Sequence, residues 1–484
     1  MGRGWLRLAV ALAVVVVLAA PAVPAQATPG NRAWVATYNG MLSEGDVATS
    51  VAVSPDGTRA YVTGMTDTIA HVYSAVALTI AYDSASGAEL WRASIDDVYP
   101  GVDPQAAAAP DGHLVFVAVQ TGAAVIKAYD AQTGAEVWSA QYDGGPKAGH
   151  GALLGSLAVS PGSDRVFFTG TGHPQWAPGN CCDYLTAGFD AATGARLWAQ
   201  HYNGAGGARD VATSIAVSPS GRAVYITGYC DQNYPMWSKN EDMVTFAYRA
   251  SDGKTLWMRQ YSEAGHGSYQ EGHDLVVGPG GGHLYVVGDT IARHSIGADF
   301  VVLAYSAGTG RELWVQHYSG GDDWSCCIVA DQARVYVSGQ GEGPYGYQQE
   351  VVAFDARTGA QLWTHTKNHV VGWCDHGRGL YPNGCMSEWT AGSVIYVVGT
   401  WGYPPDLWRS DTQDIVVDAY DGATGKVLWS DSFDPSVGQD DYAFDVAVSP
   451  DGDRLFVVGY SELSQDPSHD YYEPDWITIA YDTT

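Results

Sequence analysis

One short phrase returns along almost the whole chain, and this internal repetition constrains the fold more than any other feature. Clear copies are AYDSASGAELW at 81–91, AYDAQTGAEVW at 128–138 and YDGATGKVLW at 420–429. The copies end in tryptophans that follow one another at intervals of 47 to 66 residues, namely Trp91, Trp138, Trp198, Trp257, Trp314, Trp363 and Trp429. A unit of this size buries its hydrophobic side only against its neighbours, so the units are expected to stack.

A second phrase precedes the first and divides each repeat into strands. It reads VAVSPDGTRAYVTG at 51–64, IAVSPSGRAVYITG at 215–228 and VAVSPDGDRLFVVG at 446–459. Each repeat therefore predicts four short strands, which we name A to D. Strands A and B flank the Ser-Pro turn, strand C ends in Ala-Tyr-Asp, and strand D contains Leu-Trp. Four strands at this period are typical of a β-propeller blade.

The two ends of the chain complement each other. The last repeat stops at 481–484, where its strand D is expected to begin. The segment Trp34–Gly40 matches Trp198–Gly204, which is a strand D in the middle of the chain. We therefore predict that the N-terminal strand completes the last blade and leaves no exposed sheet edge. The predicted fold is all-β: one domain, residues 28–484, forming an eight-bladed β-propeller of four-stranded blades.

The phrase Ala-x-Asp-x-x-Thr-Gly-x-x-x-Trp resembles the quinoprotein-type repeat, also described as pyrroloquinoline-quinone-like. The resemblance covers about residues 33–484. It implies that the phrase docks each blade onto the next, so the repeat tryptophans are interpreted as structural. It also implies one candidate activity, that of a dehydrogenase that uses pyrroloquinoline quinone with Ca²⁺. Because one fold hosts many activities, the resemblance indicates architecture more strongly than function.

Residues 1–27 have the pattern of a secretory signal peptide. Arg3 and Arg7 precede the apolar run Leu8–Ala20, and Ala25-Gln26-Ala27 offers small residues for cleavage. No later stretch is apolar for 18 residues, so no membrane span is expected after signal cleavage. The chain has 24 Lys and Arg against 53 Asp and Glu, a net charge of −29, which excludes a nucleic-acid-binding protein. We predict a secreted, extracellular monomer.

Export permits disulfides, and the sequence contains seven cysteines. Cys374 and Cys385 flank a Gly- and Pro-rich loop that suits a bridge. The adjacent residues Cys326 and Cys327, like the similar pair Cys181-Cys182, form either a strained vicinal disulfide or bridges to different cysteines. The odd count leaves Cys230 as the free thiol by default. The spacings typical of zinc sites and of haem attachment are absent from the sequence.

The long B–C loops and the D–A connections between blades are expected on one face of the ring, and function is expected there. These loops are rich in aromatic residues, which suit a sugar or a protein partner. Aspartates recur where strand A begins, at Asp46, Asp210, Asp322 and Asp441. A second series opens strand C, at Asp183, Asp242, Asp299, Asp414 and Asp475. Each series is either a repeated backbone cap or a ring of carboxylates able to hold Ca²⁺ or a polar ligand.

The innermost strand contributes the other candidate residues. Alignment of the repeats places Cys326 beside Ser50, Ser214, Asp274 and Asp445, close to the axis. Trp324 and the Cys326-Cys327 pair would form a ligand platform there, and the quinoprotein resemblance implies a vicinal disulfide near the central ligand. His273 with Asp274 is a candidate base. The predicted ligand-binding set is Asp46, Asp210, Asp322, Trp324, Cys326, Cys327, His273, Asp274 and Asp441.

Three functions remain open from the sequence. The first is a binding propeller for an extracellular carbohydrate or protein, which needs only the rigid ring and its loops. The second is a carbohydrate-active lyase or hydrolase, for which no diagnostic constellation of residues is found. The third is the pyrroloquinoline quinone dehydrogenase, which is not favoured because long inserts with the catalytic and Ca²⁺-binding residues of that family are not recognisable. Neither catalysis nor a cofactor is assigned.

Overall fold

The protein is described here from a computed structural model. It describes residues 28–40, 45–69, 74–99, 102–143, 152–172, 183–204, 209–231, 241–262, 269–291, 297–319, 323–343, 346–368, 370–371, 386–389, 394–401, 413–435, 439–465 and 472–484. The predicted signal peptide lies outside these residues and stays a prediction. Every regular element of the described chain is a β-strand. None of the described residues forms a helix that could cross a membrane.

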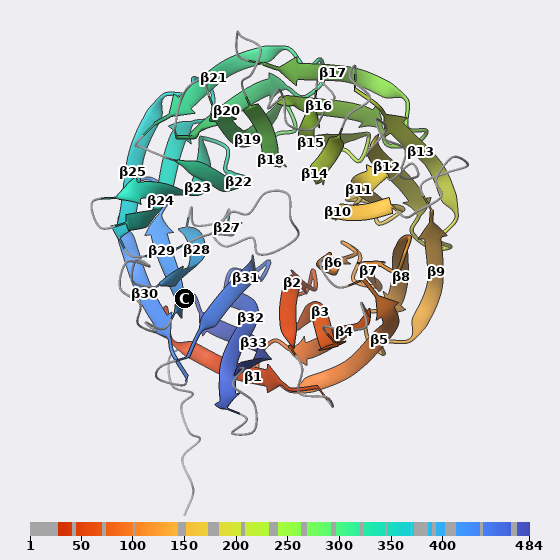
Figure 1. Cartoon of the computed structure of the whole chain (residues 1–484), viewed down its shortest axis with the longest axis vertical. Helices are drawn as coiled ribbons and strands as arrows, with labels where there is room; N and C mark the ends of the chain where they lie inside the picture. The colour runs from red at the N-terminus through yellow and green to blue at the C-terminus, as the bar shows by residue number, and fades with distance from the viewer. Residues whose placement is uncertain are drawn as a thin grey trace, which may run out of the picture.

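The strands form antiparallel sheets arranged radially around a central axis, as Figure 1 shows. We number the blades in chain order, with strand A at the axis and strand D at the rim. Blade 1 contains β2 (Val47–Val53), β3 (Arg59–Ile69), β4 (Ser74–Asp83) and β5 (Glu89–Val98). Blade 2 contains β6 (Gln105–Ala108), β7 (Leu114–Gln120), β8 (Ala124–Asp130) and β9 (Glu136–Tyr142). Blade 3 contains β10 (Ala152–Val159), β11 (Arg165–Gly172), β12 (Asp183–Asp190) and β13 (Arg196–Tyr202). Blade 4 contains β14 (Asp210–Val217), β15 (Ala223–Asp231), β16 (Glu241–Arg249) and β17 (Thr255–Tyr261).

The second half of the ring follows the same plan. Blade 5 contains β18 (Tyr269–Val277), β19 (His283–Ile291), β20 (Asp299–Ser306) and β21 (Glu312–Tyr318). Blade 6 contains β22 (Trp324–Ala330), β23 (Arg334–Gly343), β24 (Gly346–Asp355) and β25 (Gln361–Asn368). Blade 7 contains β28 (Val394–Trp401), β29 (Asp414–Asp421) and β30 (Val427–Phe433), with β26 (Val370–Val371) and β27 (Met386–Trp389) both paired to β28. Blade 8 contains β31 (Asp441–Val448), β32 (Arg454–Gln465), β33 (Tyr472–Asp482) and β1 (Arg32–Tyr38). The all-β propeller predicted from the repeats is confirmed.

The N-terminal strand closes the ring. Strand β1 pairs antiparallel with β33, with Trp34 opposite Ala480 and Tyr38 opposite Trp476. Figure 1 shows β1, in red, lying beside the blue C-terminal strands. The first and last strands of the fold thus share one sheet, as the sequence predicted, and every strand of that sheet is paired within the ring.

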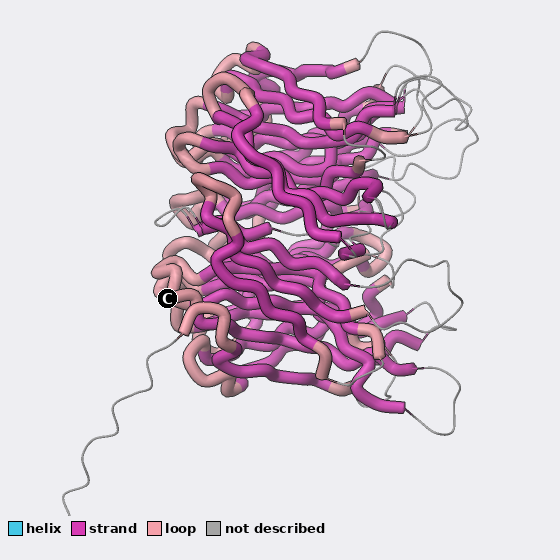
Figure 2. The backbone as a smooth tube through the Cα atoms, turned by 90° about the vertical axis from the view of Figure 1, so that its left-hand side faces the viewer, coloured by secondary structure: helices cyan, strands magenta, loops and turns pink. Residues whose placement is uncertain are grey.

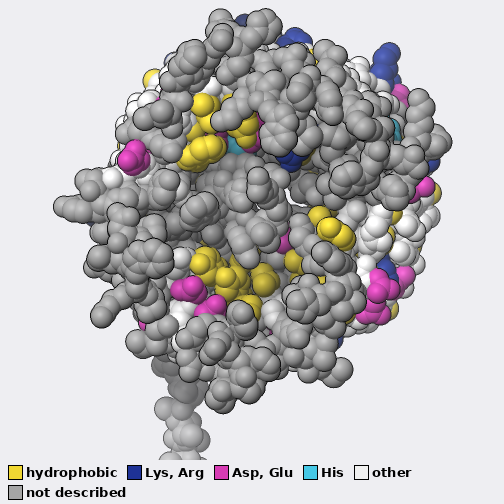
Figure 3. Space-filling view, in the orientation of Figure 1, with side chains coloured by type: hydrophobic (Ala, Val, Ile, Leu, Met, Phe, Trp, Pro, Cys, Tyr) yellow, Lys and Arg dark blue, Asp and Glu magenta, His cyan; other side chains and the backbone are white. Residues whose placement is uncertain are grey.

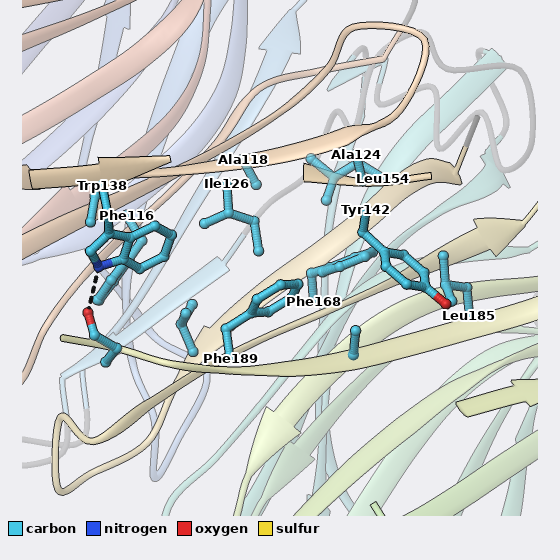
Figure 4. Close-up of a cluster of buried hydrophobic side chains, with 14 of the residues drawn as sticks. Phe116, Ala118, Ala124, Ile126, Trp138, Tyr142, Leu154, Phe168, Leu185 and Phe189 are labelled. Carbon is cyan, nitrogen blue, oxygen red and sulfur yellow. Dashed lines mark hydrogen bonds between the residues drawn. The ribbon is translucent and has the colours of Figure 1, made fainter. Parts of the chain in front are cut away.

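Neighbouring blades are joined at the rim by a tryptophan clasp. The indole N–H of Trp138 donates to the carbonyl oxygen of Ala191 on the next blade at 2.8 Å, and Figure 4 shows this bond beside Phe116. Gly194 follows in a left-handed turn with φ of 71°, and a Cβ there would lie 2.6 Å from the Trp138 ring. Only glycine fits that contact, which explains the Gly of the repeat.

The clasp recurs around the ring. Indole-to-carbonyl bonds of 2.8–3.1 Å join Trp34 to Ser84, Trp91 to Ala131, Trp138 to Ala191, Trp198 to Ala250, Trp257 to Ala307, Trp314 to Ala356 and Trp363 to Gly422. Between the clasps, the facing sheets bury apolar side chains such as Phe168 and Leu185 (Figure 4). The repeat tryptophans are therefore structural.

The turns gather on one side of the ring. Figure 2 shows the short A–B and C–D turns along one edge, at the left of that view. The strand ends that lead into the B–C loops and D–A connections lie on the opposite side, which we call the long-connection face. This face is toward the viewer in Figure 1.

Candidate functional site

The first aspartate series opens strand A on the long-connection face. Asp46 directly precedes β2, Asp210 begins β14 and Asp441 begins β31. Their side chains are buried, with exposed fractions of 1%, 0% and 0%. Asp322 lies outside the described residues. Buried carboxylates need hydrogen bonds or a counter-charge, so the partners of these three decide between a cap and a ligand site.

At the junction from blade 8 to blade 1, which we call the 8/1 junction, the carboxylates are capped by the chain. The backbone N–H of Gly40 donates to Asp46 at 2.5 Å, and Thr66 donates to the other oxygen at 2.5 Å. The amide of Asn39 donates to Asp475, on β33 of blade 8, at 2.6 Å. The Asn-Gly pair after strand D thus serves both aspartate series.

The 3/4 junction, from blade 3 to blade 4, repeats this arrangement. Gly204 N–H donates to Asp210 at 2.6 Å, and the Asn203 side chain is hydrogen-bonded to Asp183. The Cys230 thiol also contacts the Asp210 carboxylate. Burial raises the pKa of Asp210 to about 7, against the opposing effect of the Gly204 bond. These two junctions favour the backbone-cap interpretation of the sequence.

The 7/8 junction is different. Asp434 and Pro435 stand where the other two junctions have asparagine and glycine. Neither carboxylate oxygen of Asp441 has a hydrogen-bond partner, although the residue is fully buried. One oxygen each of Asp414, Asp434 and Asp441 lies within 4.8 Å of the others. Burial first, and then the charges of Asp434 and Asp414, raise the pKa of Asp441 to about 7.

The long-connection face is acidic in this sector. Asp440, next to Asp441, accepts from the backbone of Gln413 at 3.0 Å, and its own N–H lies 3.5 Å from Glu462. Figure 3 shows this face, with acidic side chains in the sector of β31 and β32 beside hydrophobic side chains that border the centre. The 7/8 junction therefore brings together Asp414, Asp434 and Asp441, none of which belongs to an ion pair of the described chain.

The inner strands correct the predicted alignment at the cysteines. The pairing of strands A and B is interrupted by a bulge in several blades: between Gly272 and Asp274 in blade 5, and between Ser325 and Cys327 in blade 6. Cys327, not Cys326, is therefore the equivalent of Asp274. The sequence alignment missed this because the A–B turn of blade 6 is two residues shorter than that of blade 5: Ala330 pairs with Val335, whereas Val277 pairs with Leu284.

The structure decides between the two alternatives that the sequence left open for Cys326 and Cys327. Cys327 is a free thiol, whereas Cys326 is disulfide-bonded, so its bridge is to a different cysteine, the second alternative that the sequence left open. Cys230 is a free, buried thiol, as expected from the odd count. Trp324 begins β22 opposite Gln340 and is partly exposed. The vicinal bridge is therefore excluded, and ligand binding at Trp324 and these cysteines stays a prediction. Cys181, Cys182, Cys374 and Cys385 lie outside the described residues.

His273 and Asp274 are neighbours in sequence but have different hydrogen-bond partners. The Nε2 atom of His273 lies 2.9 Å from Asp289, in the interior. Asp274 accepts from the Ser214 hydroxyl at 2.8 Å and from the Ile328 backbone at 3.1 Å, which joins the inner strands of blades 4, 5 and 6. The predicted pairing of this histidine and aspartate as a base is not observed, and Asp274 has a structural role.

A buried pair of glutamates was not found by sequence reasoning. Glu241 begins β16 and Glu271 lies on β18, where their side chains share a hydrogen bond. Burial and the neighbouring Glu241 hold the pKa of Glu271 well above its usual range. Only 2% of Glu271 is exposed. The two residues belong to different blades, and no spacing in the sequence brings them together.

The residues at the axis do not fit a quinone cofactor. Pyrroloquinoline quinone carries three carboxylates, which require cationic partners in a buried site. The described innermost strands, β2, β6, β10, β14, β18, β22, β27 and β31, contain no lysine or arginine. Their polar side chains, such as Asp274 and Asp445, are acidic or bond to neighbouring blades; Asp445 accepts from the Val51 backbone at 2.9 Å. We therefore derive no step through this cofactor.

Comparison with solved structures supports the fold. The chain is similar to Chaetomium thermophilum Sqt1 bound to the N-terminus of the ribosomal protein L10, with 12% identity, 93% of this chain and 100% of that chain covered, and a TM-score of 0.58. It is similar to Saccharomyces cerevisiae Sqt1, with 10% identity, coverage of 93% and 98%, and a TM-score of 0.54. It is also similar to quinohemoprotein alcohol dehydrogenase from Comamonas testosteroni, with 14% identity, coverage of 93% and 76%, and a TM-score of 0.51. At these identities the likeness concerns the fold alone.

Comparison of sequences gives the family. No curated protein matches the chain. The family model described as outer membrane protein assembly factor BamB matches three overlapping segments, residues 22–229, 76–268 and 183–366. The matches together extend over well more than half of the chain and confirm the quinoprotein-type repeat inferred from the sequence. The chain therefore belongs to the family of repeat propellers described as outer membrane protein assembly factor BamB.

Proposed function

We propose that this protein is a secreted binding propeller that takes a basic segment of a protein partner on its long-connection face. The proposal rests on a difference in how buried polar groups are hydrogen-bonded in different parts of the ring. Around the axis and at the rim, buried polar groups serve blade-to-blade bonds, such as Asp274 with Ser214 and Trp138 with Ala191. On the long-connection face, Asp441 has a carboxylate without such a partner.

Charge favours a basic partner over a neutral sugar. The chain has a net charge of −29, and the acidic sector of the long-connection face is formed by groups such as Asp434 and Asp440. Such a surface speeds the encounter with a cationic segment. The similar Sqt1 structure was solved with the N-terminus of a ribosomal protein, so a propeller of this shape can bind a protein segment. The family description, an assembly factor, agrees with a role in binding.

Catalysis is less well supported. The Glu241–Glu271 pair has the chemistry of acid–base catalysis, but the 2% exposure of Glu271 keeps substrate away from it. The residues at the axis do not suit a quinone. A dye-linked assay of the purified chain with added pyrroloquinoline quinone, Ca²⁺ and primary alcohols is expected to give no turnover. Turnover in that assay would replace the binding function with a dehydrogenase.

Binding is tested with defined peptides. Fluorescent 15-residue peptides rich in lysine and arginine, their sequence-scrambled versions and acidic counterparts are titrated with the chain from residue 28 onward. We expect at least one basic peptide to bind about 10-fold more tightly than its scrambled version, with affinity that falls as salt rises. If all the basic peptides bind no better than their scrambled versions, the proposed function is wrong.

Export is tested separately. Expression of the full chain in a secreting bacterial host is expected to release a protein whose first residue follows Ala27. N-terminal sequencing of the product checks this. A product that retains residues 1–27 in the cell would contradict the proposed location.

A further inference from the structure

The three related blade junctions provide an internal comparison, because they share their spacing but not their residues. Strand D is followed by Asn39-Gly40 at the 8/1 junction, by Asn203-Gly204 at the 3/4 junction and by Asp434-Pro435 at the 7/8 junction. In each case the second residue of the pair precedes the buried aspartate of the next strand A by six positions, as Gly40 precedes Asp46. The three junctions are therefore the same structural element with different residues.

The two substitutions at the 7/8 junction remove both hydrogen-bond donors. Proline has no backbone N–H, so Pro435 lacks the group that Gly40 and Gly204 donate to their aspartates. Aspartate has no amide N–H, so Asp434 lacks the group that Asn39 donates to Asp475. Asp434 also adds a third negative charge beside Asp414 and Asp441. A capped pair of carboxylates becomes an uncapped cluster of three.

The cluster has no counter-charge of its own. Asp441 is fully buried and both its carboxylate oxygens are without a hydrogen-bond partner. Ser461 lies opposite it in the sheet, and its hydroxyl lowers the pKa of Asp441 as a neutral neighbour but brings no counter-charge. Among the ion pairs of the described chain, none includes Asp414, Asp434 or Asp441. An unpaired buried charge is costly, and here the chain has replaced the groups that relieve it elsewhere.

We propose that the 7/8 junction is a calcium site in which Asp414, Asp434 and Asp441 are the protein ligands. All three offer carboxylate oxygens, which hard divalent cations prefer, and the cluster contains neither cysteine nor histidine. Calcium binds oxygens at about 2.3–2.6 Å, so one ion fits between oxygens at most 4.8 Å apart. Magnesium requires shorter bonds, of about 2.0–2.1 Å, in a strict octahedron, which suits this spacing less well.

The ion would replace the two hydrogen-bond donors that Asp434 and Pro435 lack. Asp414 opens strand C of blade 7, Asp434 follows strand D of the same blade, and Asp441 opens strand A of blade 8. A cation held by all three connects two adjacent blades at the long-connection face. At the other two junctions, amide and backbone N–H groups make that connection. This site needs no second protein, but it shares Asp434 and Asp441 with the acidic sector to which the proposed partner is assigned.

The test measures calcium binding and stability together. The chain from residue 28 onward is stripped with EDTA, titrated with CaCl₂ by calorimetry and melted with and without the ion. We expect one Ca²⁺ per chain at this junction and a rise in melting temperature of about 3 °C at a free concentration 100-fold above Kd. The same concentration of MgCl₂ is expected to give a smaller rise. An equal rise with MgCl₂ would overturn the assignment to calcium.

Two variants locate the ion. The double substitution Asp434→Asn with Pro435→Gly rebuilds the sequence of the 8/1 junction, so it should fold without the ion and lose the calcium response. Asp210→Asn, at the 3/4 junction, is the matched control and should keep that response in full. A wild-type chain without calcium binding, or a rebuilt junction that still binds the ion, would refute the proposal.

Discussion

The repeated contacts at the rim of this propeller are kept from blade to blade, whereas those on its long-connection face vary. At the rim, the tryptophan clasp is nearly identical for seven of the repeat tryptophans, with indole bonds of 2.8–3.1 Å. On the long-connection face, even equivalent junctions differ, as Gly40 and Pro435 do. A contact that recurs in every copy is required by the fold. A departure in one copy, at a position that the other copies keep, is where a specific role is to be sought.

The difference also separates two ways of joining blades. The clasp combines a hydrogen bond with apolar burial, so it resists changes of pH and salt. The junctions depend on buried carboxylates, whose neutralisation depends on donors, protons or ions. We therefore expect changes at the rim to alter stability strongly under all conditions. Changes at the junctions should alter stability less, and in a way that depends on the solution.

The largest effect is expected from removal of β1. Deletion of residues 28–40 exposes the edge of β33 and takes away Trp34, which clasps blade 1. The product is expected to aggregate or to lose its cooperative melting transition. Circular dichroism melts and size-exclusion chromatography check this, with the chain from residue 28 onward as control. A soluble monomer with an unchanged melting temperature would contradict ring closure by β1.

Removal of a single clasp comes next. Trp138→Ala deletes a buried ring and the bond to Ala191, and should lower the free energy of unfolding by about 3–5 kcal/mol. Denaturant titration of the EDTA-treated chain measures the loss. The loss should be equal in EDTA and in CaCl₂, because no carboxylate takes part. A dependence on calcium would mean that the rim and the long-connection face are not independent.

The glycine of the clasp gives a smaller and more specific effect. Gly194→Ala adds a Cβ that meets the Trp138 ring in a left-handed turn and should cost about 2–4 kcal/mol. Gly122→Ala is the matched control, because φ is also positive there but no atom lies within 4 Å of the added Cβ; it should cost about 1 kcal/mol. Combined with Trp138→Ala, Gly194→Ala should cost no more than this control. Additive costs would show that ring contact is not the reason for the glycine.

At the 8/1 junction, Asn39→Asp makes one of the two changes found at the 7/8 junction. It removes the donor to Asp475 and places two carboxylates together, so it should cost about 1–3 kcal/mol in EDTA. Asn39→Ala separates the lost bond from the added charge. If both variants are as stable as the wild type, the amide does not cap this junction and the comparison between junctions fails.

The smallest effect concerns pH at the 3/4 junction. The pKa of Asp210 in the fold is about 7, above the usual value of an aspartate, because the residue is buried. A raised carboxyl pKa stabilises the fold at low pH, and this contribution is lost as pH rises from about 4 to about 7. Asp210→Asn should therefore lessen the fall in melting temperature between pH 5 and pH 8, by roughly 1 °C. An unchanged pH profile would show that Asp210 is ionised throughout.

Much of the fold could be predicted because the same strand pattern recurs in several repeats. The Thr-Gly and Leu-Trp positions fixed the strands and the clasp, and the match of Trp34–Gly40 to Trp198–Gly204 located the closing strand. Repetition also revealed the aspartates that open strands A and C. The change of residues at the 7/8 junction can also be read from the sequence, since Phe433-Asp434-Pro435 aligns with Tyr38-Asn39-Gly40. Its consequence depends on which hydrogen-bond donors reach which carboxylates, and only the structure shows that.

The other errors have physical causes. The A–B turn of blade 6 is two residues shorter than that of blade 5, so Cys326 was assigned the position that Cys327 occupies. Hydrogen bonds between strands join residues without a fixed sequence spacing, so His273 was associated with Asp274 rather than with Asp289 on the next strand of the same blade. The pair of Glu241 and Glu271 was missed for the same reason. Neighbours within a strand point to opposite faces, and the relevant partner lies on another strand.

Because β1 and β33 share a sheet, the last blade can be completed only after the C-terminal strand has been synthesised. Trp34 is synthesised among the first residues of the fold, and its pairing partner Ala480 is among the last. The entropy of closing so long a loop grows only with the logarithm of its length, so the delay costs time more than stability. A chain interrupted before β33 has no partner for β1 and keeps two open edges. The ring is therefore sealed only once β33 is present to pair with β1.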